Sequence, residues 1–100
     1  MEDFVWLGTK LKYLIKITAV GFSMLTDDFN IILTRGSKSV TFEKSDLVTD
    51  GDDYYIIFDT AQFGAGELYY KITAYVPDDD FPDGLRPEVF KKRLTTIKSS

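Results

Sequence analysis

Residues 10–18 have the sequence Lys-Leu-Lys-Tyr-Leu-Ile-Lys-Ile-Thr, in which apolar and polar side chains alternate. The apolar residues that share one face are Leu11, Tyr13, Ile15 and Ile17. Lysine or threonine occupies most of the positions on the other face, and only one leucine interrupts the pattern. A period of two suits a strand with one face on a core, whereas a helix would scatter these apolar residues around its cylinder. The segment therefore predicts a half-buried β-strand.

The same alternation recurs in segments 29–34, 38–44 and 67–76, which are separated by turns rich in glycine and aspartate. Segment 54–59 is apolar on both faces, which is typical of a central strand. Turn signals at intervals of about 8–12 residues predict an all-β fold, an Ig-like β-sandwich of six to eight mostly antiparallel strands. Because a chain of 100 residues supports one core, we expect residues 1–100 to form a single domain.

The expected core consists of the inward-facing positions of these strands. They are Leu11, Tyr13, Ile15, Ile17, Phe29, Ile31, Leu33, Val40, Phe42, Ile56, Phe58, Leu68, Tyr70, Ile72 and Ala74. Residues 77–88 are polar and predict a loop. Residues 89–98 fit a helix, with Pro87 before its first turn, or a strand that contains Thr-Thr-Ile. We favour the strand, because an open sandwich edge needs a partner.

The sequence contains no cysteine and no histidine. Their absence removes disulfides, zinc–thiolate sites, the commonest general base and all Ser-His or Cys-His arrangements. The glycines form no phosphate-binding loop. We therefore expect no enzyme activity, no catalytic residue and no cofactor. The chain begins with acidic residues and has no long apolar run, so we expect neither a signal peptide nor a membrane span.

Two acidic groups are candidates for a calcium site. The first lies within residues 78–88 and the second within residues 46–53. Oxygen ligands on a flexible loop suit Ca²⁺, but the spacing does not match an EF-hand. Solvated loops whose carboxylates cap turns explain the same composition. We favour that interpretation and expect no required metal.

The C-terminal segment is basic, and its cations include Arg86, Lys91, Lys92 and Arg93. Residues 85–100 carry a formal charge of +4, and the remaining 84 residues carry −8. The acidic pI of about 4.7 and the lack of interleaved aromatic residues argue against nucleic-acid binding. A solvated strand face is one alternative. Contact between the acidic body of one copy and the basic end of its neighbour is another.

Phe4, Trp6 and Leu7 belong to an apolar run near the N-terminus. The run is either a first strand tucked between the sheets or an arm that docks on a partner with Trp6 as its anchor. The hypothesis for partner binding combines both chain ends. Its residues are Phe4, Trp6, Leu7, Arg86, Lys91, Lys92 and Arg93. Tyr69 and Tyr75, with Tyr54 or Tyr55, are candidates for an aromatic face that contacts protein or carbohydrate. The alternative, which is the more common case, is that these tyrosines simply cover the sheet.

Several segments taken in order resemble the Ig-like domains of tailed-phage virions. They are residues 10–18, 28–34, 53–60, 63–66, 67–77 and 80–84. Examples of that group are the N-terminal domain of baseplate upper proteins and small auxiliary or decoration proteins of phages that infect gut Bacteroidales. The resemblance spans residues 9–98 and implies a structural role on a particle without catalysis. It assigns no functional residue.

The baseplate proteins continue into a second domain, whereas this sequence ends at Ser100. We therefore expect a small stand-alone component of a phage or prophage virion. Such a component would lie in the virion, or in the host cytoplasm before assembly, and would contact other virion proteins in many copies. The alternative is a free-standing β-sandwich module that binds a carbohydrate or a protein ligand.

Overall fold

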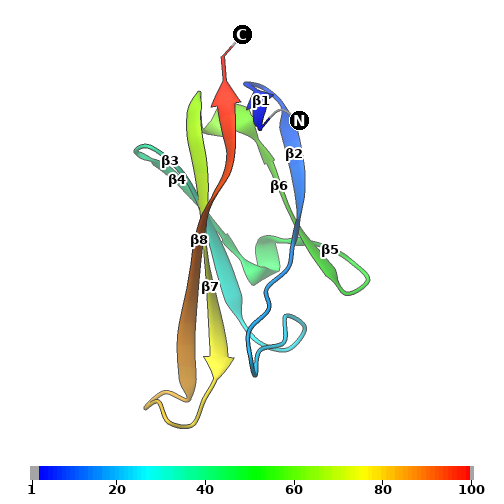
Figure 1. The fold of residues 1–100 in the computed structure, drawn as a ribbon. Helices are drawn as coiled ribbons and strands as arrows, with labels where there is room; N and C mark the ends of the chain where they lie inside the picture. Colours follow the sequence, from blue (N-terminus) through cyan, green and yellow to red (C-terminus); the bar gives the residue numbers. More distant parts are fainter. Residues whose placement is uncertain (1–2, 100) are drawn as a thin grey trace.

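The computed structural model describes residues 3–99 as eight strands and two short 3₁₀ turns, arranged as two packed sheets (Figure 1). Met1, Glu2 and Ser100, the outermost residues of the predicted domain, lie outside the described residues. The prediction of an all-β sandwich with six to eight mostly antiparallel strands is confirmed. Antiparallel pairing joins every pair of neighbouring strands except the two that hold the chain ends.

The strand order follows the immunoglobulin pattern. The larger sheet has the order β1 (Phe4–Trp6), β8 (Leu85–Lys98), β7 (Gly66–Pro77), β3 (Phe29–Arg35) and β4 (Lys38–Glu43). The smaller sheet has the order β2 (Lys10–Ile15), β6 (Asp53–Asp59) and β5 (Val48–Asp50). In immunoglobulin lettering, β2, β6 and β5 correspond to B, E and D. Strands β8, β7, β3 and β4 correspond to G, F, C and C′.

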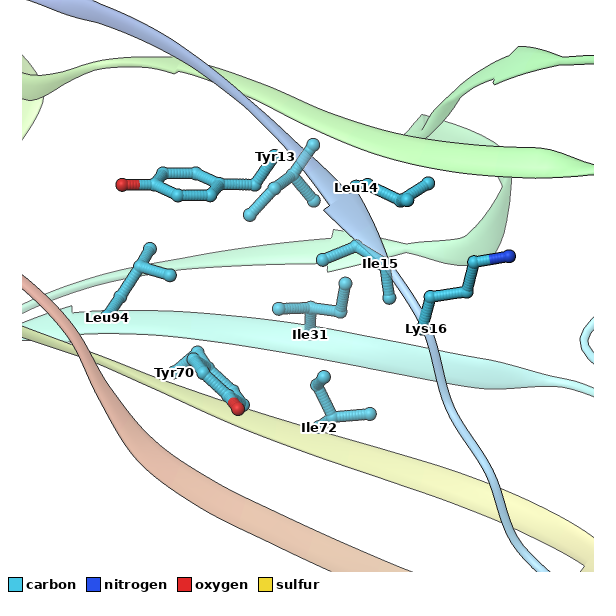
Figure 2. A pocket seen from close by; sticks show the side chains of 9 residues that line it. Tyr13, Leu14, Ile15, Lys16, Ile31, Tyr70, Ile72 and Leu94 are labelled. Carbon is cyan, nitrogen blue, oxygen red and sulfur yellow. The ribbon is translucent and has the colours of Figure 1, made fainter.

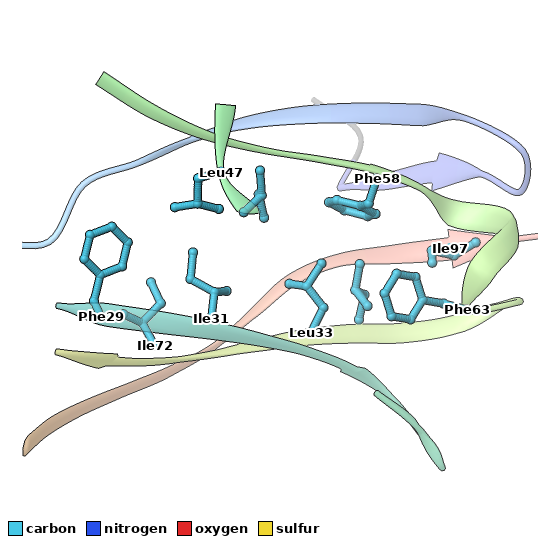
Figure 3. Close-up of a cluster of buried hydrophobic side chains, with 10 residues drawn as sticks. Phe29, Ile31, Leu33, Leu47, Phe58, Phe63, Ile72 and Ile97 are labelled. Carbon is cyan, nitrogen blue, oxygen red and sulfur yellow. The ribbon is translucent and has the colours of Figure 1, made fainter. Parts of the chain in front are cut away.

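The core lies between the two sheets, with side chains of both inner faces interleaved (Figure 3). Every predicted core residue is buried or packs on the buried cluster. The prediction omitted Phe63 and Ile97, which are both almost fully buried. Phe63 follows the 3₁₀ turn Thr60–Gln62 and packs edge-to-face on Phe58, at 5.8 Å between ring centroids. A residue in a Gly-rich corner carries no periodic signal, so its burial was not visible in the sequence.

Strand β2 ends earlier than its alternation predicts. The expected strand covered residues 10–18, whereas β2 stops at Ile15. Ile15 is the last residue that pairs with β6, opposite Tyr54, and β6 begins one residue before Tyr54, so residues 17 and 18 have no strand to pair with. The backbone N–H of Ile17 instead donates to the sulfur of Met24, at 3.3 Å.

The last strand confirms the preference for a strand over a helix in residues 89–98, but it begins at Leu85. The predicted loop of residues 77–88 is therefore too long, and the observed connection is residues 78–84. Pro87 lies inside β8 opposite Tyr75, whose N–H donates to the Asp28 carbonyl on the far side of β7, at 3.0 Å. Pro87 therefore occupies a position from which no backbone hydrogen bond to β7 is needed, and this explains why the strand continues through the proline.

The first strand, β1, is correctly predicted as a strand but not in its position. It lies at the edge of the five-stranded sheet, parallel to β8, and not between the sheets. The chain then turns at Gly8, whose φ of 98° lies in the left-handed region, and crosses to the other sheet as β2. β1 thus covers part of one edge of the larger sheet, and the chain then supplies an edge strand of the smaller sheet.

Candidate contact surfaces

The N-terminal strand presents an aromatic patch at the rim of the sandwich. Phe4 and Trp6 point to the same side and pack edge-to-face, at 5.1 Å between ring centroids. The Lys98 ammonium lies 4.2 Å from the Phe4 ring centroid. Trp6 is 52% exposed and Leu7 is 41% exposed. We call Phe4, Trp6, Leu7 and Lys98 the rim patch.

The backbone beneath the rim patch is tied to both sheets. The Leu7 N–H donates to the Lys98 carbonyl at 2.8 Å. The fully buried Thr60 hydroxyl accepts a hydrogen bond from the Gly8 N–H and donates one to the Thr9 carbonyl, both at 2.9 Å. The segment is therefore part of the fold and at the same time exposes its largest side chain. The two sequence interpretations, structural strand and docking anchor, are compatible.

The basic residues of the predicted site differ in how their charge is compensated. Arg86 pairs with Asp78 at 2.5 Å and lies 3.8 Å from Glu88. Arg93 pairs with Asp3 and lies 3.7 Å from Glu67.

Lys91 and Lys92 are exposed, and neither forms an ion pair within residues 3–99. Lys91 also lies directly opposite Lys71 of β7, a pairing of like charges that costs stability. Among the basic residues of the predicted site, Lys91 and Lys92 are therefore the two without an ion pair in the described chain.

The structure does not bring all predicted site residues together. Arg93 reaches the rim patch through Asp3, its neighbour in space. Arg86 lies near the other end of β8, twelve residues before Lys98, which corresponds to about 40 Å of extended strand. The molecule is 51 Å long, and the rim patch and Arg86 lie near opposite ends of β8. The single predicted interface becomes a rim patch and a separate middle section of β8.

The acidic loop after β7 uses its carboxylates within the loop. Asp78 accepts from the Asp80 N–H at 3.0 Å and binds Arg86. Asp83 accepts from the Leu85 N–H at 3.2 Å. In the second acidic group, Asp46 accepts from the Glu43 N–H at 2.9 Å. These contacts are turn caps of the kind that we favoured for these carboxylates. Within residues 3–99, no three acidic side chains are placed so that they could hold a metal ion together.

A cavity of about 210 Å³ opens at the seam between β2 and β8 (Figure 2). Its lining is almost wholly apolar and includes Leu14, Tyr70 and Leu94, with Lys16 at its margin. Burial raises the pKa of the Tyr13 hydroxyl above its ordinary value. The residues that line this cavity include no carboxylate.

The tyrosines do not form one aromatic face. Tyr69 and Tyr75 lie on the outer face of β7, and Tyr75 accepts from Asn30 at 3.4 Å. Tyr55 belongs to the other sheet, with the Lys12 ammonium 4.4 Å from its ring centroid. Tyr54 packs edge-to-face on Phe29 in the core. Tyr69 and Tyr75 therefore share the outer face of β7, and neither Tyr54 nor Tyr55 joins them there.

No family model, curated protein or solved structure matches the chain. Between residues 3 and 99, no helix has the length and apolar character to cross a membrane. What this protein does must therefore be argued from its own surfaces.

Proposed function

We propose that the protein is a non-enzymatic structural component of a phage or prophage virion. In this role it decorates or joins parts of the capsid or of the tail and baseplate through protein–protein contacts. The observation that carries the proposal is the rim patch, where a strand held by backbone hydrogen bonds exposes Trp6 and Leu7. The resemblance of the strand sequence to Ig-like virion domains supplies the class of particle.

The rim patch has the properties of a contact site. Tryptophan and other large side chains dominate the energy of protein interfaces, and exposed apolar clusters mark such sites. Because Thr60 and Lys98 hold β1 in place, Trp6 loses little conformational freedom when a partner covers it. A single anchor is worth about 2 kcal/mol or more, and many copies on one particle multiply such contacts. The protein would lie in the virion, or in the host cytoplasm before assembly.

The experiment is immunogold electron microscopy of particles purified from the producing lysate, combined with co-sedimentation of added protein. We expect label on the particles and a tenfold or greater loss of bound Trp6→Ala protein, which corresponds to about 1.4 kcal/mol or more. Val20→Ala is the matched control, because Val20 is also exposed but lies far along the chain from β1. Particles without label, or equal binding of Trp6→Ala, would contradict the proposal. Binding to an isolated ligand instead of a particle would favour a free-standing binding module.

A further inference from the structure

Strand β8 has an open edge over most of its length. β1 pairs with Thr96, Ile97 and Lys98 only, and residues 85–95 have β7 on one side and no strand of the described chain on the other. We call residues 85–95 the open edge. In Figure 1 this part of β8 runs beside β7 towards the loop that joins them, away from β1. Unpaired N–H and C=O groups in such a row are a template for a further strand.

The pairing register identifies which backbone groups are free. The Tyr75 N–H points away from β8 to Asp28, so Tyr75 and its partner Pro87 do not exchange hydrogen bonds. Alternate residues of a strand direct their backbone groups to the same edge. The N–H and C=O groups of Val89 and Lys91 therefore point outward from the open edge.

The side chains of the residues that alternate with Val89 and Lys91 point to the inner face of the larger sheet. Glu88, Phe90 and Lys92 lie opposite β7 residues of the inner face, which are Ala74, Ile72 and Tyr70. Phe90 is 37% exposed and borders a cavity of about 200 Å³. Val89, on the outer face, is 52% exposed. Apolar surface is thus uncovered on both faces of the open edge.

The charges on the inner face are arranged symmetrically about Phe90. Glu88 lies two residues before it and Lys92 two residues after it, with opposite charge. Within the described chain Lys92 has no ion-pair partner. Glu88 has only a 3.8 Å contact with Arg86, which binds Asp78 more closely at 2.5 Å.

We propose that two copies of the chain pair through this edge, β8 against β8 in antiparallel orientation, about a two-fold axis at Phe90. Val89 of each copy then exchanges backbone hydrogen bonds with Lys91 of the other. The two Phe90 rings face each other in a non-hydrogen-bonded pair, the closer of the two kinds. Glu88 of each copy lies opposite Lys92 of the other, so both ion pairs form at once.

The length of the open edge supports this register. It runs from residue 85 to residue 95, so its midpoint is Phe90. In the proposed pairing, Pro87 of the second copy lies opposite Arg93, the last residue before the bulge at Leu94, so the paired stretch ends before the edge that β1 occupies. The second β8 therefore fills the edge without displacing β1.

Other symmetric registers bring like charges together. An axis at Lys91 places the two Lys91 side chains directly opposite each other. An axis at Val89 places Lys92 opposite Arg86. Like charges in directly opposed positions are destabilising, so the charges select the axis at Phe90. The self-complementary arrangement is the hallmark of an isologous interface.

Charge reversal tests the ion pairs. Sedimentation velocity over a concentration series gives the dimer Kd of the parent, of Lys92→Glu, of Glu88→Lys and of the double variant. Each single reversal places like charges opposite each other twice, and we expect the Kd to rise about tenfold or more. The double variant restores complementarity, and we expect its Kd to return to near that of the parent. Lys91→Glu has the same change in net charge as Lys92→Glu but lies opposite Val89, so it is the matched control.

A backbone variant tests the ladder independently of charge. Val89→Pro removes an N–H that the monomer does not use, so the domain should stay folded by circular dichroism while dimerisation is lost. A parent that remains monomeric at about millimolar concentration, where a Kd corresponds to only about 4 kcal/mol, overturns the proposal. So does a double variant that is no tighter than either single variant. Capture of an added acidic, extended peptide in place of a second copy would assign the edge to a different occupant and also overturn it.

The inference does not rest on the proposed function. Trp6→Ala should leave the dimer Kd unchanged, because the rim patch lies beyond the open edge. Loss of particle binding and loss of dimerisation are therefore separate results.

Discussion

The two parts of β8 differ although one strand contains both. At its carboxyl-terminal end, β8 lies between β7 and β1, and Ile97 is buried. Along the open edge it has one neighbour, and Val89 and Phe90 are exposed although they are as apolar as the buried end. A β-bulge at Leu94, the residue that the pairing register skips, separates the two parts. The apolar side chains of this strand are therefore more exposed where the second neighbour is missing.

We expect the largest decrease in the free energy of unfolding when a buried side chain is shortened at the end of β8 that β1 covers. Ile97 is 1% exposed, so Ile97→Ala leaves a cavity and should lower the free energy of unfolding by about 2–5 kcal/mol. Phe90→Ala, in the open part, should cost about 1 kcal/mol or less at concentrations where the chain is monomeric. Urea unfolding measures both. Equal losses would remove the distinction between the two parts.

We expect a smaller decrease in the free energy of unfolding when the segment that follows β1 is held less tightly. The end of β8 that β1 covers would then lose part of its second neighbour. Thr60→Val removes the hydroxyl that binds the Gly8 N–H and the Thr9 carbonyl. The expected cost is about 1–2 kcal/mol, together with faster hydrogen exchange at the Leu7 amide. Thr49→Val is the control, because Thr49 lies exposed on β5. Unchanged exchange at Leu7 would show that β1 is held without Thr60.

Removing the exposed anchor should have a still smaller effect on folding. Trp6→Ala loses the edge-to-face contact with Phe4, which is worth about 0.5–1.5 kcal/mol. Thermal unfolding should show a small decrease in Tm with a cooperative transition retained. A variant that fails to fold would identify Trp6 as a core residue and would withdraw the rim patch as a contact site.

The smallest expected effect is the contribution of Tyr13, which lines the cavity beside β8, to the pH dependence of the free energy of unfolding. Burial raises the pKa of Tyr13 above its ordinary value of about 10, so the unfolded chain ionises first as the pH rises. The contribution of Tyr13 is fully present below about pH 10 and is lost as the pH rises towards the folded pKa. Denaturant titrations of the parent and of Tyr13→Phe at several pH values measure it. Parallel curves through pH 10–11 would contradict the shift.

Local pattern was enough to predict the sheet faces. Alternation in residues 10–18 depends only on the geometry of one strand, and the four apolar residues it selected all pack on the core. The end of the strand was not predictable in this way, because Ile15 is the last residue with a partner in β6. Strand β5 was missed for a related reason. Its three residues are all exposed and lie beside a turn, so they carry no periodic signal.

For the candidate surfaces, the sequence identified the residue types but not their grouping. Phe4, Trp6 and Leu7 were recognisable as an apolar run, and Lys91 and Lys92 as part of a basic one. Pairing of Arg93 with Asp3, 90 residues away, could not be seen in either segment. This pairing compensates the charge of Arg93, whereas Lys91 and Lys92 form no ion pair in the described part of the chain.

The sequence by itself determined the fold class, the faces of the strands and the core, because these depend on side-chain alternation along an extended chain. The tertiary structure alone decided where strands end, which charges are compensated and which apolar residues stay exposed. Each of these depends on a neighbour that is distant in sequence. On β8, the three residues of β1 decide how far the second edge is paired: it is covered at Thr96, Ile97 and Lys98 and open before them.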